Sequence, residues 1–99
     1  MIASNRLILT GRVVELEPLR YTPAGVAIVR FKIEHDSEQI EAGAVRQLHM
    51  EIACVATETM ARLVCAAPLG SSLRVDGFIA HRSKTHRGIE LHALDIQFE

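Results

Sequence analysis

Tryptophan is absent from this 99-residue sequence, and Tyr21 is its only tyrosine. Exposed aromatic rings are the usual surfaces on which unpaired nucleic-acid bases stack, so most of that equipment is missing. An excess of charge is missing too, because 11 lysines and arginines face 12 aspartates and glutamates. The chain is therefore not a general polycation, and any affinity for a polyanion must come from local clusters of charge.

Cysteine is scarce: Cys54 and Cys65 are the only two. We predict two reduced thiols rather than a disulfide or a metal pair. None of the five histidines stands at the spacing of a zinc site with a cysteine or another histidine, so we expect no metal and no cofactor. No apolar run is long enough to cross a membrane, and the first residues lack a signal-peptide layout, which predicts a cytoplasmic protein.

Catalytic motifs are also missing. The segment Gly70-Ser71-Ser72 lacks the frame of a nucleophile elbow, and no phosphate-binding loop of the G-x-x-x-x-G-K-[ST] type occurs. The acidic residues are scattered along the chain rather than grouped. The sequence therefore predicts a protein that is not an enzyme.

Alternating apolar residues predict five strands, and a helix is predicted between the third and the fourth. The strands are expected at residues 6–14, 26–35, 45–56, 72–79 and 89–98, and the helix at 58–67, with Thr57 as its cap. Gly11 and Gly77 inside strands favour the bends of a small closed barrel. We predict an all-β protein with one domain, residues 1–99, folded as a five-stranded OB-fold barrel.

Two segments need a more specific expectation. The acidic residues 36–43 are predicted to form a hairpin tip, with Leu48 and Met50 pointing inward on the following strand. In the last strand the alternation shifts, which indicates a bulge near Ala93 and places Leu94 and Phe98 inward.

The strongest candidate site is the segment HRSKTHR at residues 81–87, in the hairpin between the last two strands. Arg82, Lys84 and Arg87 are permanent cations, and His81 and His86 accompany them. Either this is a solvated hairpin tip, or it neutralises phosphates, which requires cations at this density. The OB fold binds oligonucleotides with this loop, and its position therefore favours the second interpretation.

Weaker candidates surround this loop. Four further cations, Arg12, Arg30, Lys32 and Arg46, either extend a cationic track along the strands or belong to ordinary charged strand faces. Of these, Arg12, Lys32 and Arg46 are expected as secondary contacts. Tyr21 and His49 are candidate stacking platforms, although Tyr21 could equally pack against its own loop. Phe78 is out of phase with the core and is expected to cover either a base or a subunit interface.

Short blocks along nearly the whole chain resemble the bacterial primosomal replication protein N (PriB) family, within the single-stranded DNA-binding protein superfamily. The blocks are residues 5–11 (NRLILTG), 18–20 (PLR), 22–25 (TPAG), 34–35 (EH), 41–43 (EAG), 46–47 (RQ), 70–71 (GS), 75–79 (VDGFI) and 91–93 (LHA). Each block is weak alone, but their common order and spacing are fairly specific.

The resemblance implies a homodimeric OB-fold protein that binds single-stranded DNA and assists the primosomal helicase in replication restart. The basic loop lysines of the family correspond to the region of Arg82, Lys84 and Arg87, and a strand arginine corresponds to Arg46. The chain departs from the family at Ala44 and His49, where aromatic residues are expected, and at Asp36, where a basic residue is expected.

Two alternatives remain. One is a general single-stranded DNA-binding protein, which is disfavoured because no glycine-rich linker or acidic tail follows the predicted barrel. The other is a protein-interaction module that docks a helicase and scarcely touches DNA, which the missing aromatics favour.

Overall fold

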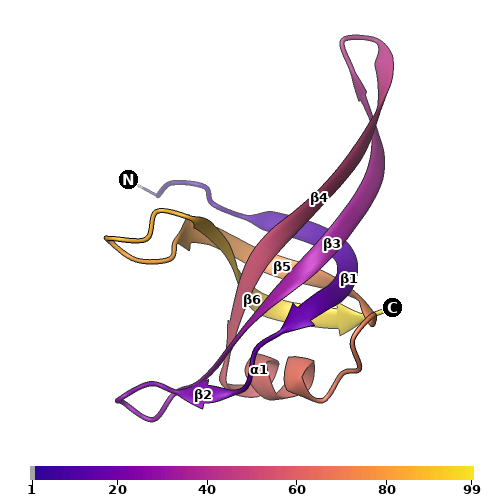
Figure 1. Cartoon of the computed structure of the whole chain (residues 1–99). Helices are drawn as coiled ribbons and strands as arrows, with labels where there is room; N and C mark the ends of the chain where they lie inside the picture. Colours follow the sequence, from indigo (N-terminus) through magenta and orange to yellow (C-terminus); the bar gives the residue numbers. More distant parts are fainter. Residues whose placement is uncertain (1) are drawn as a thin grey trace.

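The computed structural model describes residues 2–99 as one sheet that closes into a barrel (Figure 1). Its strands are β1 (Leu7–Leu16), β2 (Arg20–Tyr21), β3 (Ala27–Glu41), β4 (Ala44–Thr57), β5 (Ser72–His81) and β6 (Ile89–Phe98), with the helix α1 (Glu58–Cys65) between β4 and β5. The strand order is β1-β5-β6-β4-β3-β2, and an additional pairing of β1 with β3 closes the barrel. The five long strands and the single helix confirm the predicted OB fold.

Strand β1 closes the barrel because it belongs to two ladders. Its first half pairs with β5, from Leu7 opposite Gly77 onward, and its second half pairs with β3, from Arg12 opposite Glu34 onward. Gly11 lies where the strand passes from one partner to the other. A Cβ atom on Gly11 would lie 2.5 Å from the Glu34 carbonyl oxygen, so a larger residue would push the two strands apart.

The core is made of the inward-facing residues of the strands and one face of α1. The largest fully buried side chains are Ile33, Leu73, Leu91, Val13, Val29, Val64, Val75 and Cys54. The helix closes one end of the barrel with Ala61 and Val64. It ends at Cys65, two residues earlier than predicted.

Thr57 occupies the N-cap position, as predicted, but its side chain makes no capping hydrogen bond. The next residue, Glu58, begins the helix with a φ of 52°. Its carboxylate accepts a hydrogen bond from the Ala27 backbone N–H at 3.3 Å and so ties the helix to the start of β3.

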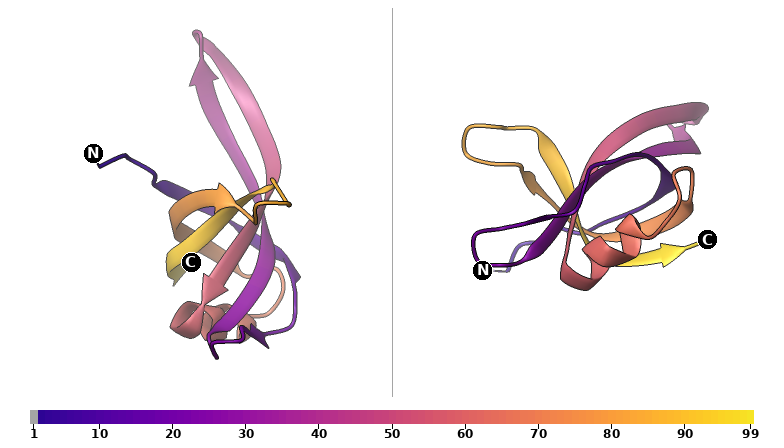
Figure 2. Two further views of the ribbon diagram at one scale, coloured as in Figure 1. Left: turned by 90° about the vertical axis from the view of Figure 1, so that its left-hand side faces the viewer. Right: turned by 60° about the horizontal axis from the view of Figure 1, so that its bottom comes forward.

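Strands β3 and β4 continue past the barrel as a long hairpin, which we call the arm (residues 36–49; Figures 1 and 2). The prediction of a loop over residues 36–43 is therefore wrong, because the ladder persists to Glu41 opposite Ala44. Only Ala42 and Gly43 form the turn, with φ values of 53° and 78°. Both faces of the arm meet solvent, so polar residues replace the alternation that marks a strand, and Met50 at its base is exposed rather than inward.

The bulge predicted near Ala93 is confirmed. Asp76 pairs with Asp95 and Gly77 pairs with Ala93, which leaves Leu94 without a partner. The inward placement of Leu94 and Phe98 is wrong: the bulge turns Leu94 out into solvent, and Phe98 lies at the strand end, beyond the core.

Both cysteines are free, as expected, with Cys54 buried and Cys65 half-buried. Burial, helped by the negative charge of Glu90, raises the pKa of the Cys54 thiol to about 12. Within residues 2–99, no helix has the length and apolar character needed to cross a membrane.

Candidate nucleic-acid interface

The basic loop connects β5 and β6 and is held by hydrogen bonds of its own. The Arg82 N–H donates to the Gly88 carbonyl at 2.9 Å, and the Ser83 N–H donates to the His86 carbonyl at 3.0 Å. The His86 ring accepts the Gly88 N–H at Nδ1, 3.2 Å away. The loop is thus a closed structure that holds its side chains in solvent, with residues 81–89 all exposed.

The three cations of this loop are unpaired. Within residues 2–99, Arg82, Lys84 and Arg87 form no ion pair with a carboxylate. Of the other lysines and arginines, only Arg74 is also unpaired in this part of the chain. Of the four cations that lack a carboxylate partner within residues 2–99, three therefore lie in one loop.

The predicted secondary contacts have a different environment, because each of them pairs with a carboxylate. Arg12 lies 2.9 Å from Glu34, Arg46 lies 2.7 Å from Glu41, and Lys32 lies 3.5 Å from Glu15 and 3.7 Å from Glu51. Their charges are largely balanced on the protein itself, so a phosphate would have to compete with these carboxylates.

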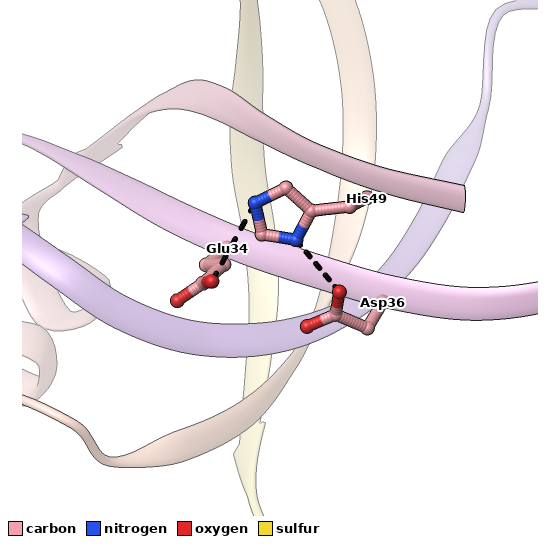
Figure 3. Close-up of side chains that lie close together, drawn as sticks. All are labelled: Glu34, Asp36 and His49. Atoms are coloured by element: carbon pink, nitrogen blue, oxygen red, sulfur yellow. Dashed lines mark hydrogen bonds and ion pairs between the residues drawn. The ribbon is translucent and has the colours of Figure 1, made fainter. Parts of the chain in front are cut away.

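His49 lies on the arm between two carboxylates (Figure 3). Its Nδ1 is 2.7 Å from Asp36 Oδ1, and its Nε2 is 3.6 Å from Glu34 Oε1. The hydrogen bond to Asp36 and the negative charge of Asp36, followed by the charges of Glu34 and Glu51, raise the pKa of His49. One ligand atom from each of Glu34, Asp36 and His49 lies within 4.8 Å of the others, and the group is held together by these two ion pairs.

Tyr21 lies on β2, on the side of the barrel where the β5–β6 loop also projects (Figure 1). Its side chain is 62% exposed, and it lines a hollow of about 400 Å³ together with Arg30 and Arg82. Tyr21 and the basic loop are thus brought together by the fold. Arg46 and His49 lie on the arm and do not line this hollow.

Sequence reasoning missed an ion pair beside this hollow. Arg30 on β3 donates from Nε to Glu90 Oε2 on β6 at 2.9 Å, and Glu90 is 4% exposed. The only hint in the sequence is a glutamate between Ile89 and Leu91 in an apolar strand. The pairing could not be foreseen, since it requires the spatial order of β3, β4 and β6.

Two other side chains acquire intramolecular partners. Phe78 stacks on His92 with ring centroids 4.7 Å apart and planes at 8°. His35, which the sequence did not single out, joins β1 to the base of the arm through Thr10 O and Ser37 Oγ, both 2.7 Å from its ring nitrogens.

The chain resembles known proteins over nearly its whole length. The sequence model of a family described as "another single-strand binding protein family" matches residues 5–95. Replication restart protein PriB of Nitrosomonas europaea is 35% identical over 95% of this chain and 87% of its own, and that of Bordetella pertussis is 38% identical over 89% and 82%.

Solved structures agree with these matches. The protein PriB from Ralstonia solanacearum superposes with a TM-score of 0.89 at 32% identity, over 98% of this chain and 99% of the other. A small single-stranded DNA-binding protein from Streptomyces coelicolor shares the fold, with a TM-score of 0.76 at 16% identity over 100% and 96% of the two chains. The chain therefore belongs to the replication restart protein PriB family, within the wider family of single-strand binding proteins.

Proposed function

We propose that this protein binds single-stranded DNA through the β5–β6 loop and serves as a non-catalytic, cytoplasmic accessory protein of the replication-restart primosome. The observation that carries the proposal is the group of three cations, Arg82, Lys84 and Arg87, which form no ion pair within residues 2–99 and lie together in this loop. Its relatives are named replication restart proteins, which supports the biological setting.

The mechanism is mainly electrostatic. Each phosphate neutralised by a loop cation releases counterions, and this release stabilises the complex at low salt. His81 and His86 lie in the same segment and add hydrogen-bond donors close to the phosphate backbone of the bound DNA. Tyr21 supplies a stacking face across the hollow, while Arg12, Lys32, Arg46 and His49 contribute less because carboxylates already hold them.

A titration of fluorescently labelled oligothymidylate at several salt concentrations tests this mechanism. With about three to five phosphate contacts, we expect log affinity to fall against log salt with a slope of roughly −2 to −3.5. Saturable binding that does not depend on salt would contradict the electrostatic mechanism.

A docking module is the second candidate, because the carboxylate-bound cations of the arm and the single exposed tyrosine limit the DNA contacts of this chain. In that case the barrel binds the helicase and scarcely touches DNA. Absence of DNA binding even at low salt, with retained binding to the cognate helicase, would favour this function over the first.

We also propose a homodimer as the functional unit. Ile8 on β1 is 41% exposed, and Val14 is half-buried, so apolar side chains remain open beside the charged residues of this strand. Covering such a strand protects it from unwanted pairing. Light scattering at micromolar concentration should give twice the chain mass, and a monomer mass would exclude the dimer.

A further inference from the structure

The hollow beside the basic loop is built by three separate elements. Tyr21 comes from β2, Arg30 from β3, and Arg82 from the first position after β5. Its volume of about 400 Å³ is in the size range of small-molecule sites. An aromatic ring and three arginines, Arg20, Arg30 and Arg82, therefore line one concave space that is open to solvent, and of these Arg20 is paired with Glu17 at 3.4 Å.

Arg30 does not hang freely into this space. Its Nε–H is bound to Glu90 at 2.9 Å, and within the described residues this is its only side-chain hydrogen bond, so the Nη donors have no side-chain acceptor. A guanidinium held at Nε keeps a fixed plane, and it can offer the remaining donors to a phosphate as a preformed fork.

Glu90 is unusual because its side chain is only 5% exposed. A buried ion pair is weak evidence for stability, since desolvation of the two charges offsets their attraction. The pair also cancels its own net charge. It therefore contributes directed hydrogen bonds to a ligand, whereas long-range attraction comes from Arg82, which has no carboxylate partner within residues 2–99.

We propose that this hollow binds one nucleotide of the single strand, with the base against Tyr21 and the phosphate between Arg30 and Arg82. Glu90 is a positioning residue that holds the Arg30 guanidinium in the direction of the phosphate. This inference rests on the proposed DNA binding and names the subsite at which the strand meets the barrel.

The chain carries its own probe for this subsite. Tyr21 is the only tyrosine and tryptophan is absent, so intrinsic tyrosine emission reports on this hollow alone. Addition of a ten-residue oligothymidylate should change this emission, with the same midpoint as the anisotropy of the labelled strand. Replacing Tyr21 with alanine should weaken binding on the order of tenfold, as expected when one base loses its stacking partner.

The decisive variant replaces both charges, as Arg30→Met with Glu90→Leu. Exchange of a buried ion pair for packed apolar residues is often neutral for stability, so this protein should fold, which its thermal midpoint will show. Because the net charge is unchanged, we expect affinity to fall on the order of tenfold while the salt slope stays the same. Replacing Arg82 with glutamine should instead make the slope shallower by about 0.7.

The single variant Glu90→Leu distinguishes the orienting effect of Glu90 on Arg30 from the effect of its negative charge on DNA binding. It removes a negative charge near the DNA, so charge alone predicts tighter binding. Positioning predicts weaker binding and a smaller change in tyrosine emission. Arg74→Gln, which removes an unpaired cation from β5 outside the hollow, is the matched control and should leave the emission change intact.

Two results would overturn the inference in distinguishable ways. If labelled DNA binds with an unchanged Tyr21 emission, and Arg30→Met/Glu90→Leu binds like the parent, the strand does not enter the hollow, although DNA binding itself stands. If no labelled DNA binds at low salt, the proposed DNA binding and the subsite both fall.

Discussion

The β5–β6 loop and the β3–β4 arm both contain basic residues, but only those of the loop are left without carboxylate partners and so can attract an anionic ligand. Arg82, Lys84 and Arg87 form no ion pairs within residues 2–99, whereas on the arm Arg46 is bound by Glu41 and His49 by Asp36. The number of basic residues in a segment is therefore a poor guide to the charge that a ligand meets. Carboxylates on the neighbouring strand determine how much positive charge is left for a ligand.

The geometry of the two regions explains this difference. On an antiparallel ladder, side chains directly opposite each other lie about 4.5–5.5 Å apart at Cβ, close enough for ion pairs. Asp36 stands opposite His49 in this way. The loop has no ladder and no acidic residue between His81 and Gly88, so its cations have no carboxylate at hand.

The largest effect on stability should come from Gly77→Ala, which would distort the β5–β6 hairpin that carries the basic loop. A Cβ on Gly77 would overlap the carbonyl of His92 on the neighbouring strand, at the bulge of the β5–β6 hairpin. We expect the free energy of unfolding to fall by about 3 kcal/mol or more. Urea unfolding measures the loss. Gly25→Ala, where nothing lies within 4 Å of the added Cβ but the φ of 85° disfavours a side chain, measures the cost of backbone strain without a clash and should be smaller.

The direct test exchanges for alanine the unpaired cations of the loop in one variant and three cations that are paired with carboxylates in another. Replacing Arg82, Lys84 and Arg87 together should weaken DNA binding about 100-fold at 0.1 M salt and flatten the salt slope by about 2, because three phosphate contacts are lost. Replacing Arg12, Lys32 and Arg46 should have a much smaller effect, since carboxylates already hold these residues. Equal losses in both variants would refute the distinction between available and paired charge.

Proton binding sharpens the comparison, because the charge of His49 on the arm depends on pH. Its pKa is raised above 6.5 in the folded protein, so it contributes stability that is fully present below about pH 6.5 and is lost as pH rises through the raised value. The stability difference between the parent and His49→Gln should therefore shrink on going from acidic to alkaline pH. NMR titration should place the His49 pKa above 6.5, and Asp36→Asn should lower it, because the hydrogen bond to Asp36 is the main cause; no change in Asp36→Asn would exclude this explanation.

The smallest effect concerns the turn of the arm. Ala42 and Gly43 both have positive φ, as in a type I′ turn, and alanine is strained in that region. Ala42→Asn should stabilise the protein by about 0.5–1 kcal/mol, because asparagine followed by glycine suits this turn. DNA affinity should stay the same if the DNA contacts the β5–β6 loop. Tighter binding by this variant would indicate that the arm also contacts DNA. Ala44→Asn, outside the turn, is the matched control.

Much of the fold could be predicted from the sequence because inward residues such as Val29, Phe31 and Ile33 alternate with charged ones. Alternation fails where neither face is buried, and residues 36–43 of the arm were therefore predicted as a hairpin tip rather than as paired strands. The basic loop was predicted because it is local in sequence. The ion pairs of Arg30 and His49 were not, since they depend on which strands become neighbours and in what register.

The two partners of β1 also have a consequence for how the protein folds. Leu7 pairs with Gly77, so the barrel cannot close until residues at both ends of the chain have met. The β3–β4 ladder joins neighbouring segments through a two-residue turn, and such local hairpins form within about 1–10 μs, far faster than long-range pairings. We expect the arm to assemble first and β1 last, which pulse-labelled hydrogen exchange would detect as early protection of arm amides; early protection of β1 would reverse this order. While β1 is unpaired, the open edges of β3 and β5 are free to take up the β1 strand of another copy, so crowded refolding should favour exchange of this strand between chains.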